Sequence, residues 1–226
     1  MSLLDPLTVY TSALPKLRHG RSNDGGYVVC ALPDEYRYDA FISGGIADDN
    51  SFELDVLRAH PHLACDAYDP FQYPSVGQHE RFRYHQERLP DMRHFDGCSN
   101  ALVKIDIEGD EWPWLAGTLR VERMQIAQLV IELHSPHLDR WSWAALVALA
   151  ETHALVHFHA NNWDGIVTLG DGSRCPGTCE TTWVRRDLAG ALRLNAVPIP
   201  GPLDMPNRPE VADHVIDWAP FVNAGA

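Results

Sequence analysis

The sequence predicts an α/β fold, a mostly parallel sheet with helices on both faces, from three observations. Short apolar runs of strand length alternate with segments of helical period along the 226 residues, and strands separated by helices form parallel sheets. The last two strand-like runs are instead separated by a glycine-rich loop, which predicts a hairpin and one antiparallel strand. Hydrophobic residues make up 45% of the chain, enough to bury a full core.

Each predicted strand is bounded by turn residues. The first, YDAFIS, is followed by a glycine turn and by a helix whose N-cap we place at Ser51, without the regular capping box. ALVKIDIEG is the clearest strand, and QIAQLVIELH leads into the helical segment WSWAALVALAETH. VHFHANN and TTWVRR form the terminal hairpin. The strands are expected at 38–43, 62–70, 81–89, 101–109, 125–134, 156–162 and 181–186, and the long helix at 141–153.

The charge of the chain excludes some classes of partner. The net charge is -13, and the isoelectric point is near 5.2. Such a surface repels phosphate backbones and anionic lipids, so we expect neither a nucleic acid nor a membrane as partner. The N-terminus lacks the basic start and apolar run of a signal peptide, and no stretch approaches the roughly 18 to 20 apolar residues of a membrane span. We therefore expect a soluble cytoplasmic protein.

The cysteines support the same compartment. Their number is odd and three of them are scattered, which favours free thiols in a reducing environment over a disulfide framework. Two lie close together in RCPGTCE, a spacing that does not match the usual zinc knuckle. Free thiols are the favoured interpretation of this pair, and a local disulfide or half of a metal site are the alternatives. The five are Cys30, Cys65, Cys98, Cys175 and Cys179.

Residues that suit a nucleoside follow the first two predicted strands. Ligands of doubly wound sheets bind outside the carboxyl ends of the strands. Ser43, Gly44 and Gly45 follow the first strand, where small residues let a ligand approach the backbone. Asp69 ends the second strand, and an acid at that position commonly binds the two hydroxyls of a ribose.

Polar side chains also recur at alternate positions near the ends of three later strands. Side chains alternate faces along a strand, so each set shares one face. A carboxylate taken out of water is costly unless it is paired. Polar columns at several strand ends therefore favour an open cleft over a packed core. The three sets are Lys104, Asp106 and Glu108; Glu132 and His134; and His157, His159 and Asn161.

Each of these residues also has a structural interpretation. Asp106 could cap a helix that begins at Glu111. Glu132 could pair with a surface arginine, and His134 could be a satisfied histidine at a strand end. His157 is expected to be structural. Trp112 and Trp114 are expected to pack the following helix on the sheet, and walls of a ligand pocket are the alternative.

The segment KIDIEGDEW resembles the K-I-D-x-E-G-x-E signature of the FkbM-type S-adenosylmethionine-dependent methyltransferases and their methyltransferase-like relatives. Further segments resemble other parts of this family, in the family's order. The cofactor loop lacks the common G-x-G-x-G pattern. The resemblance covers roughly residues 17 to 209, through RSNDGGYVV (21–29), FISGGIADDNSFE (41–53), LVIELH (129–134), HFHANNWDG (157–165) and PGPLDMPNRP (200–209).

The resemblance implies a Rossmann-like class I methyltransferase fold. Its seven strands have the order 3-2-1-4-5-7-6, with the seventh antiparallel, and S-adenosylmethionine lies over the first two strand ends. Asp69 would bind the ribose, and Asp106 would lie near the sulfonium, whose positive charge offsets the carboxylate. The other implied cofactor contacts are Ser43, Gly44 and Gly45 around the methionine part, and Asp24, Gly25, Gly26 and Tyr27 closing over the site.

The implied reaction is O-methylation of a small hydroxylated molecule, such as a sugar or a natural-product intermediate. Asp106 and His134 are the expected catalytic residues, with His134 as the general base and Glu132 beside it. Mg²⁺ or another divalent cation held by Asp106, Glu132 and His134 is the alternative way to activate the hydroxyl. Acceptor binding is assigned to Glu108, His159 and Asn161.

We expect one methyltransferase domain over residues 1–226. It would comprise an N-terminal segment (1–36), a core (37–186) and an extended, proline-rich tail (187–226) that folds over the core. Two other function classes fit the same residues. One is a metal-dependent hydrolase or lyase that uses the carboxylates without a methyl donor, and the other is a module that binds the cofactor but has lost turnover. The sequence gives no prediction of the oligomeric state.

Overall fold

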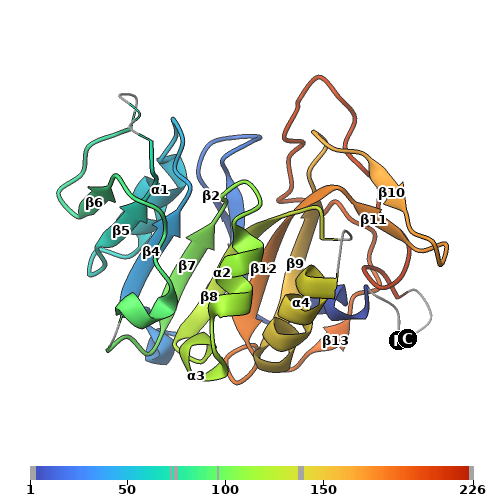
Figure 1. Cartoon of the computed structure of the whole chain (residues 1–226), viewed down its shortest axis with the longest axis horizontal. Coiled ribbons are helices and arrows are strands. Elements are labelled where there is room, and N and C mark those ends of the chain that lie inside the picture. The colour runs from blue at the N-terminus through green and yellow to red at the C-terminus, as the bar shows by residue number, and fades with distance from the viewer. Residues whose placement is uncertain (1–3, 72, 74–75, 96, 137–139, 224–226) are drawn as a thin grey trace.

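A sheet of seven strands forms the centre of the molecule, and its strand order confirms the predicted fold (Figure 1). The computed structural model describes residues 4–71, 73, 76–95, 97–136 and 140–223; the ends of the predicted N-terminal segment and tail lie outside them. The order is β6-β5-β4-β7-β8-β12-β9, which is 3-2-1-4-5-7-6 when these strands are numbered along the chain. The strands are β4 (Ala40–Gly44), β5 (Cys65–Tyr68), β6 (Phe82–His85), β7 (Ala101–Ile105), β8 (Ile126–His134), β9 (His153–Ala160) and β12 (Thr178–Arg185).

The terminal hairpin places its second strand inside the sheet. β12 pairs antiparallel with both β8 and β9, whereas the pairs from β6 to β8 are all parallel. This agrees with the predicted antiparallel strand. The connecting loop, which we predicted only as glycine-rich, contains a second small hairpin of β10 (Ile166–Thr168) and β11 (Arg174–Pro176).

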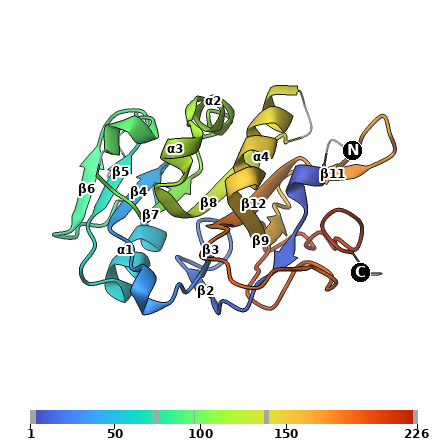
Figure 2. The same cartoon turned by 90° about the horizontal axis from the view of Figure 1, so that it is seen from below.

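Helices cover both faces of the sheet, as predicted. Figure 2 shows α2 (Glu111–Gly117), α3 (Arg120–Arg123) and α4 (Arg140–Thr152) on one face. The other face carries α1 (Ser51–Ala59) and the hairpin of β2 (Lys16–His19) and β3 (Tyr27–Cys30). The remaining elements are β1 (Tyr10–Thr11), β13 (Arg193–Leu194) and three short 3-10 helices, η1 (Asp5–Leu7), η2 (Asp34–Tyr36) and η3 (Met92–Phe95).

Strand alternation explains the two apolar cores. Leu129 and Ile131 of β8 point to the side of α2 and α4, whereas Val130 points to the side of α1. Lys104 and Glu132 have the parity of Leu102 and Val130, so they extend the α1 side toward the carboxyl ends of the strands. The sheet therefore changes from apolar to polar along one face.

The start of α1 differs from the prediction by one position. Ser51 is the first helical residue, and Asn50 is the N-cap but makes no capping bond with its side chain. The Ser51 hydroxyl donates to Asp49 and accepts the backbone N–H of Arg21 (2.8 Å). Ser51 thus ties α1 to the loop after β2.

Residues of the C-terminal tail pack against the core. Ile199, Ile216 and Phe221 are buried in the cluster on the α4 side of the sheet. β13 pairs with β1, and Ile199 pairs with Ile216. Tail residues therefore reach the strand ends near β9 and β12, where the polar side chains gather.

Two predictions about the whole chain can be compared with the structure directly. No disulfide joins any of the five cysteines, and Cys175 and Cys179 are both buried. In the part of the chain that the structure describes, no helix has the length and apolar character needed to cross a bilayer.

Candidate active site at the carboxyl ends of the strands

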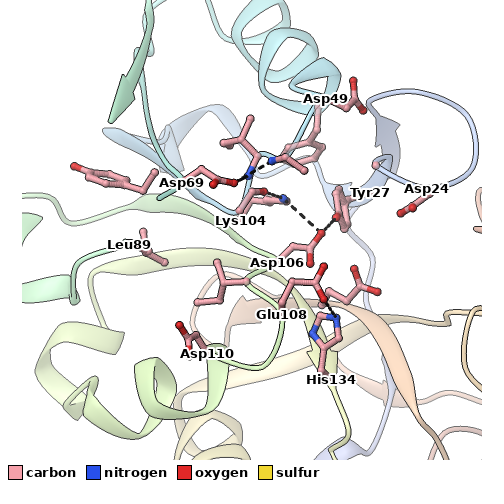
Figure 3. A pocket seen from close by; sticks show the side chains of 18 of the residues that line it. Asp24, Tyr27, Asp49, Asp69, Leu89, Lys104, Asp106, Glu108, Asp110 and His134 are labelled. Carbon is pink, nitrogen blue, oxygen red and sulfur yellow. Dashed lines mark hydrogen bonds and ion pairs between the residues drawn. The ribbon is translucent and has the colours of Figure 1, made fainter. Parts of the chain in front are cut away.

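A cavity of about 1160 Å³ opens where β4, β5, β7 and β8 end (Figure 3). The turn after β4, the loop between β7 and α2, and the loop between β2 and β3 form its walls. Ten of the predicted site residues line it: Asp24, Gly25, Tyr27, Gly45, Asp69, Asp106, Glu108, Glu132, His134 and Asn161. The tertiary structure therefore brings most of the predicted residues to one place.

Four predicted site residues belong to the described chain but do not line the cavity: Gly26, Ser43, Gly44 and His159. The Ser43 hydroxyl donates to the buried Glu53 carboxylate (2.6 Å). A Cβ at Gly44 would lie 2.8 Å from Leu89, and one at Gly26 would lie 2.2 Å from a backbone oxygen. Protein atoms, not a cavity, thus surround these three small residues.

His159 lies inside an ion cluster behind the cavity wall. Its ring nitrogens are 3.1 Å from Glu180 and 2.9 Å from Asp213 of the tail, and its side chain is buried. Burial lowers the pKa of His159, but the hydrogen bonds to the two carboxylates outweigh it and raise the pKa to about 10. His159 therefore joins β9, β12 and the tail, a role that period-two alternation could not separate from acceptor binding.

Gly45 is required by the close approach of two strands. Its φ is +76°, and a Cβ there would lie 1.5 Å from the backbone oxygen of Asp106. Its N–H donates to Tyr68 (2.9 Å), and the N–H of Asp106 donates to Gly44 (3.0 Å). The predicted backbone approach is thus made by the protein's own chain, and it places Asp106 beside the turn.

The Asp69 side chain binds the backbone of the turn between β4 and α1. One carboxylate oxygen accepts the N–H groups of Ile46 and Ala47, both at 3.0 Å. The other accepts the N–H of Phe71 (2.9 Å). A carboxylate offers roughly four acceptor positions, so three backbone bonds leave capacity for a ligand hydroxyl.

Asp106 is paired within the protein, which explains how the chain tolerates an acid directly after a buried strand. The Tyr27 hydroxyl donates to Asp106 Oδ2 (2.7 Å), and Lys104 Nζ lies 3.8 Å from the same oxygen (Figure 3). Lys104 also donates to the backbone oxygen of Gly45. Burial and then Asp106 raise the pKa of Tyr27, so its hydroxyl stays protonated and donates. Asp106 does not cap α2, whose N-cap is Asp110.

Glu111 holds His134, and the sequence analysis did not assign Glu111 to the site. Glu111 Oε1 accepts the backbone N–H of His134 (2.7 Å) and lies 3.1 Å from its Nδ1. Nε2 lies 3.5 Å from Glu108 Oε2. Burial lowers the pKa of His134, but the Glu111 hydrogen bond and the nearby carboxylates raise it overall. The fourth acid of KIDIEGDE was a sequence signal for this contact, but nothing local showed that it would reach β8.

Glu132 is buried beside Asp106 and His134. Its Oε1 accepts a bond from the Asn161 side chain (2.6 Å), so its partner is not a surface arginine. Burial, and then the charges of Asp106 and Glu180, raise its pKa well above the usual range. One ligand atom each of Asp106, Glu132 and His134 lies within 4.8 Å of the others. Two carboxylates and an imidazole at this spacing fit a divalent cation, which would replace a proton on Glu132.

Carboxylates dominate the wall of the cavity. Lys104, Arg21 and Arg88 are its basic side chains among the described residues. Arg21 lies 3.2 Å from Asp49, and Arg88 pairs with Asp110. The field inside the cavity thus favours cations over anions.

Comparison with known proteins adds little to this geometry. No family model and no curated protein matches the sequence. The chain resembles fibrillarin in its complex with Nop5p (8% identity over 65% of this chain and 72% of that one, TM-score 0.41). It also resembles an O-methyltransferase family protein from Burkholderia thailandensis (12% identity over 68% of this chain and 53% of that one, TM-score 0.37). A third similar structure is the 16S rRNA methyltransferase KamB (14% identity over 75% of this chain and 100% of that one, TM-score 0.38). TM-scores this low carry no argument about function, and the fold assignment rests on strand order and register.

Proposed function

We propose that the chain is an S-adenosylmethionine-dependent O-methyltransferase of the FkbM type that acts on a hydroxyl group of a small molecule. One observation carries the proposal. Asp69, Asp106 and His134 come from the ends of three different strands and line one cavity, in a sheet with the class I methyltransferase strand order. Each has the chemistry that one part of this reaction needs.

Asp69 and Asp106 suit the two halves of the methyl donor. Asp69 retains acceptor capacity after its three backbone bonds, and a ribose hydroxyl is a suitable donor for it. Asp106 lies farther along the cavity, at the end of β7, where its negative charge favours the sulfonium. Asp24, Gly25 and Tyr27 approach from the loop between β2 and β3 and would close this part of the site.

His134 suits the acceptor. The donor, when bound, supplies an electrophilic methyl group that is transferred by displacement at carbon. His134 Nε2 would take the acceptor's hydroxyl proton as the oxygen–carbon bond forms. Glu108 and Asn161 also line this part of the cavity and would orient the acceptor.

The size and charge of the cavity favour a small acceptor without a phosphate group. Ligand pockets for one drug-sized molecule hold roughly 300 to 1,000 Å³, and this cavity of about 1160 Å³ has room for a donor and a modest acceptor. Its two arginines already lie beside carboxylates. A neutral or cationic hydroxylated molecule therefore fits better than an anion.

A divalent cation is a second way to activate the hydroxyl, and the spacing of Asp106, Glu132 and His134 favours it. Mg²⁺ or Mn²⁺ at this site would lower the pKa of a coordinated hydroxyl, and His134 would then be a ligand. Calorimetric titration with each ion in turn tests this form of the proposal. Loss of binding in Glu132→Gln would support it, and the absence of binding by the native protein would remove it.

Calorimetry with S-adenosylhomocysteine tests the proposed function itself. We expect binding by the native protein and a loss of about tenfold or more in Asp69→Asn, the cost of one hydrogen bond to a charged group. Asp66→Asn is the matched control, because Asp66 lies in β5, three positions before Asp69, but pairs with Arg83 and His85 outside the cavity. Thermal unfolding of both variants separates an effect on the turn after β4 from an effect on the ligand.

The outcome also distinguishes the rival functions. No binding at millimolar ligand would exclude a methyltransferase, and tight metal binding in that case would point to a hydrolase or lyase. Binding of the donor without turnover of any hydroxylated acceptor would instead indicate a module that has lost catalysis. Mass spectrometry of the purified native protein, searching for a retained nucleoside, gives an independent check.

A further inference from the structure

We propose that Glu111 is the positioning residue that fixes the tautomer of His134, so that Nε2 is the nitrogen presented to the acceptor. The inference rests on the proposed role of His134 and adds a residue to it. Glu111 does not line the cavity and would touch neither the donor nor the acceptor. It acts through its hydrogen bonds to His134.

The hydrogen bonds of Glu111 allow only one tautomer of the neutral His134 ring. Its side chain is fully buried, and Oε1 accepts the backbone N–H of His134 at 2.7 Å. The same oxygen lies 3.1 Å from His134 Nδ1. A carboxylate only accepts, so Nδ1 must carry the hydrogen, and the lone pair of the neutral ring is then on Nε2. Oε2 accepts the N–H of Gly109 (2.8 Å), which holds the carboxylate in place.

The first turn of α2 also fixes the backbone of His134. The indole N–H of Trp112 donates to the backbone oxygen of His134 (2.7 Å). Glu111 and Trp112 thus bind three atoms of His134: its N–H, its oxygen and its Nδ1. The turn that leads into α2 is built for this placement, since Glu108 and Gly109 both have positive φ, +57° and +100°.

Nε2 is the ring nitrogen left for chemistry. It lies on the cavity side, 3.5 Å from Glu108 Oε2, and the Glu108 side chain is 87% exposed. When the acceptor oxygen attacks, its O–H proton passes to Nε2 as the new oxygen–carbon bond forms. The carbon–sulfur bond breaks and its electron pair stays on sulfur. The resulting imidazolium lies between Glu111 and Glu108, whose charges stabilise it.

Nitrogen-15 NMR of the imidazole rings tests the assignment without knowledge of the acceptor. In the ¹⁵N-labelled full chain, at a pH high enough that the His134 ring is neutral, we expect the hydrogen on Nδ1. His134→Gln identifies the signal. Glu111→Ala removes the acceptor for Nδ1, and the Nδ1–H form should fall from nearly the whole population to a minority.

Glu108→Gln is the matched control, because Glu108 contacts the same ring at the other nitrogen. The Nδ1–H form should persist in this variant. An Nε2–H ring in the native protein, or an unchanged Nδ1–H ring in Glu111→Ala, would overturn the inference. The native spectrum and the Glu108→Gln control decide the matter even if Glu111→Ala does not fold. Failure to bind S-adenosylhomocysteine would refute the proposed function instead, so the two failures are distinguishable.

Discussion

Single residues of the site show how this chain keeps acids inside the protein. Asp106 has two partners, the hydroxyl of Tyr27 and the ammonium of Lys104. Glu132 has the Asn161 amide as its partner, and burial and the neighbouring carboxylates raise its pKa, which favours the protonated form. His159 has two carboxylates and a pKa raised to about 10. β9 thus carries a histidine that is supported by acids, and the residue directly after this strand is an amide that supports an acid.

The titration of His159 predicts a loss of stability at high pH. Its folded pKa of about 10 is above the usual 6.5, so its protonation stabilises the fold fully below pH 6.5 and this contribution is lost as the pH rises through about 10. His159→Gln should lower the free energy of unfolding by about 3 to 5 kcal/mol at pH 6, because the buried Glu180 and the partly buried Asp213 lose their partner. The difference from the native protein should shrink toward pH 10, as measured by urea unfolding.

His153 on the same strand is the control for this pH series. It is also buried, but burial lowers its pKa to about 4, so it is neutral in the folded protein above pH 6.5. The cost of His153→Gln should therefore be constant over the alkaline range. A cost of His159→Gln that is equally constant would contradict the charged triad with Glu180 and Asp213.

At the scale of elements, the turn between β4 and α1 determines where the site lies. Three backbone N–H groups near this turn bond to Asp69, and the Lys104 ammonium bonds to Gly45. The β7 backbone then passes so close that Gly45 cannot carry a side chain. The first turn of α2 does the same for β8 through His134. Loops that contact neighbouring strands, more than the strands themselves, thus place the functional groups.

Gly45→Ala tests how rigid this turn is. Alanine at φ +76° is strained, and its Cβ would overlap the Asp106 backbone. We expect the free energy of unfolding to fall by about 3 kcal/mol or more, the sum of backbone strain and overpacking. Gly170→Ala is the control, since no described atom lies within 4 Å of a Cβ built there. Equal stability of the two variants in chemical denaturation would show that β4 and β7 can separate without cost.

At the scale of the whole molecule, charge restricts the partners. The net charge of -13 is accompanied by a cavity wall in which carboxylates outnumber basic residues. A phosphate backbone would meet repulsion at long range and again at the site. The net charge of the molecule and the carboxylates of the cavity wall both favour a small neutral or cationic acceptor, the class that we propose.

Fluorescence anisotropy with a labelled RNA hairpin tests this consequence. We expect no binding at micromolar protein, in low as well as in moderate salt, because the net charge of -13 repels a phosphate backbone. Affinity that falls steeply as salt is added would contradict the expectation and would move the proposed acceptor from small molecules to nucleic acid.

The sequence predicted the fold more completely than it predicted the site. Apolar periodicity located all seven strands of the main sheet, and the resemblance implied their order. The β10–β11 hairpin was missed because its strands are three residues each, too short for a periodic pattern. Parity grouped Asp106 with Lys104 and Glu108, and Glu132 with His134. The strand order that the resemblance implied then made Asp106 a neighbour of Glu132 and His134, and one ligand atom of each lies within 4.8 Å of the others. The same parity also grouped His159 with Asn161, although only Asn161 lines the cavity.

The sequence alone determined where the strands lie along the chain, to within a few residues at their ends, since a two-residue period and apolar runs are local properties of the chain. Only the tertiary structure decided which partner each polar side chain finds. Glu111 and His134 are 23 positions apart, and Asp213 and His159 are 54 apart. Hydrogen bonds at such separations depend on how α2 and the tail pack against the sheet, and no local pattern encodes that packing.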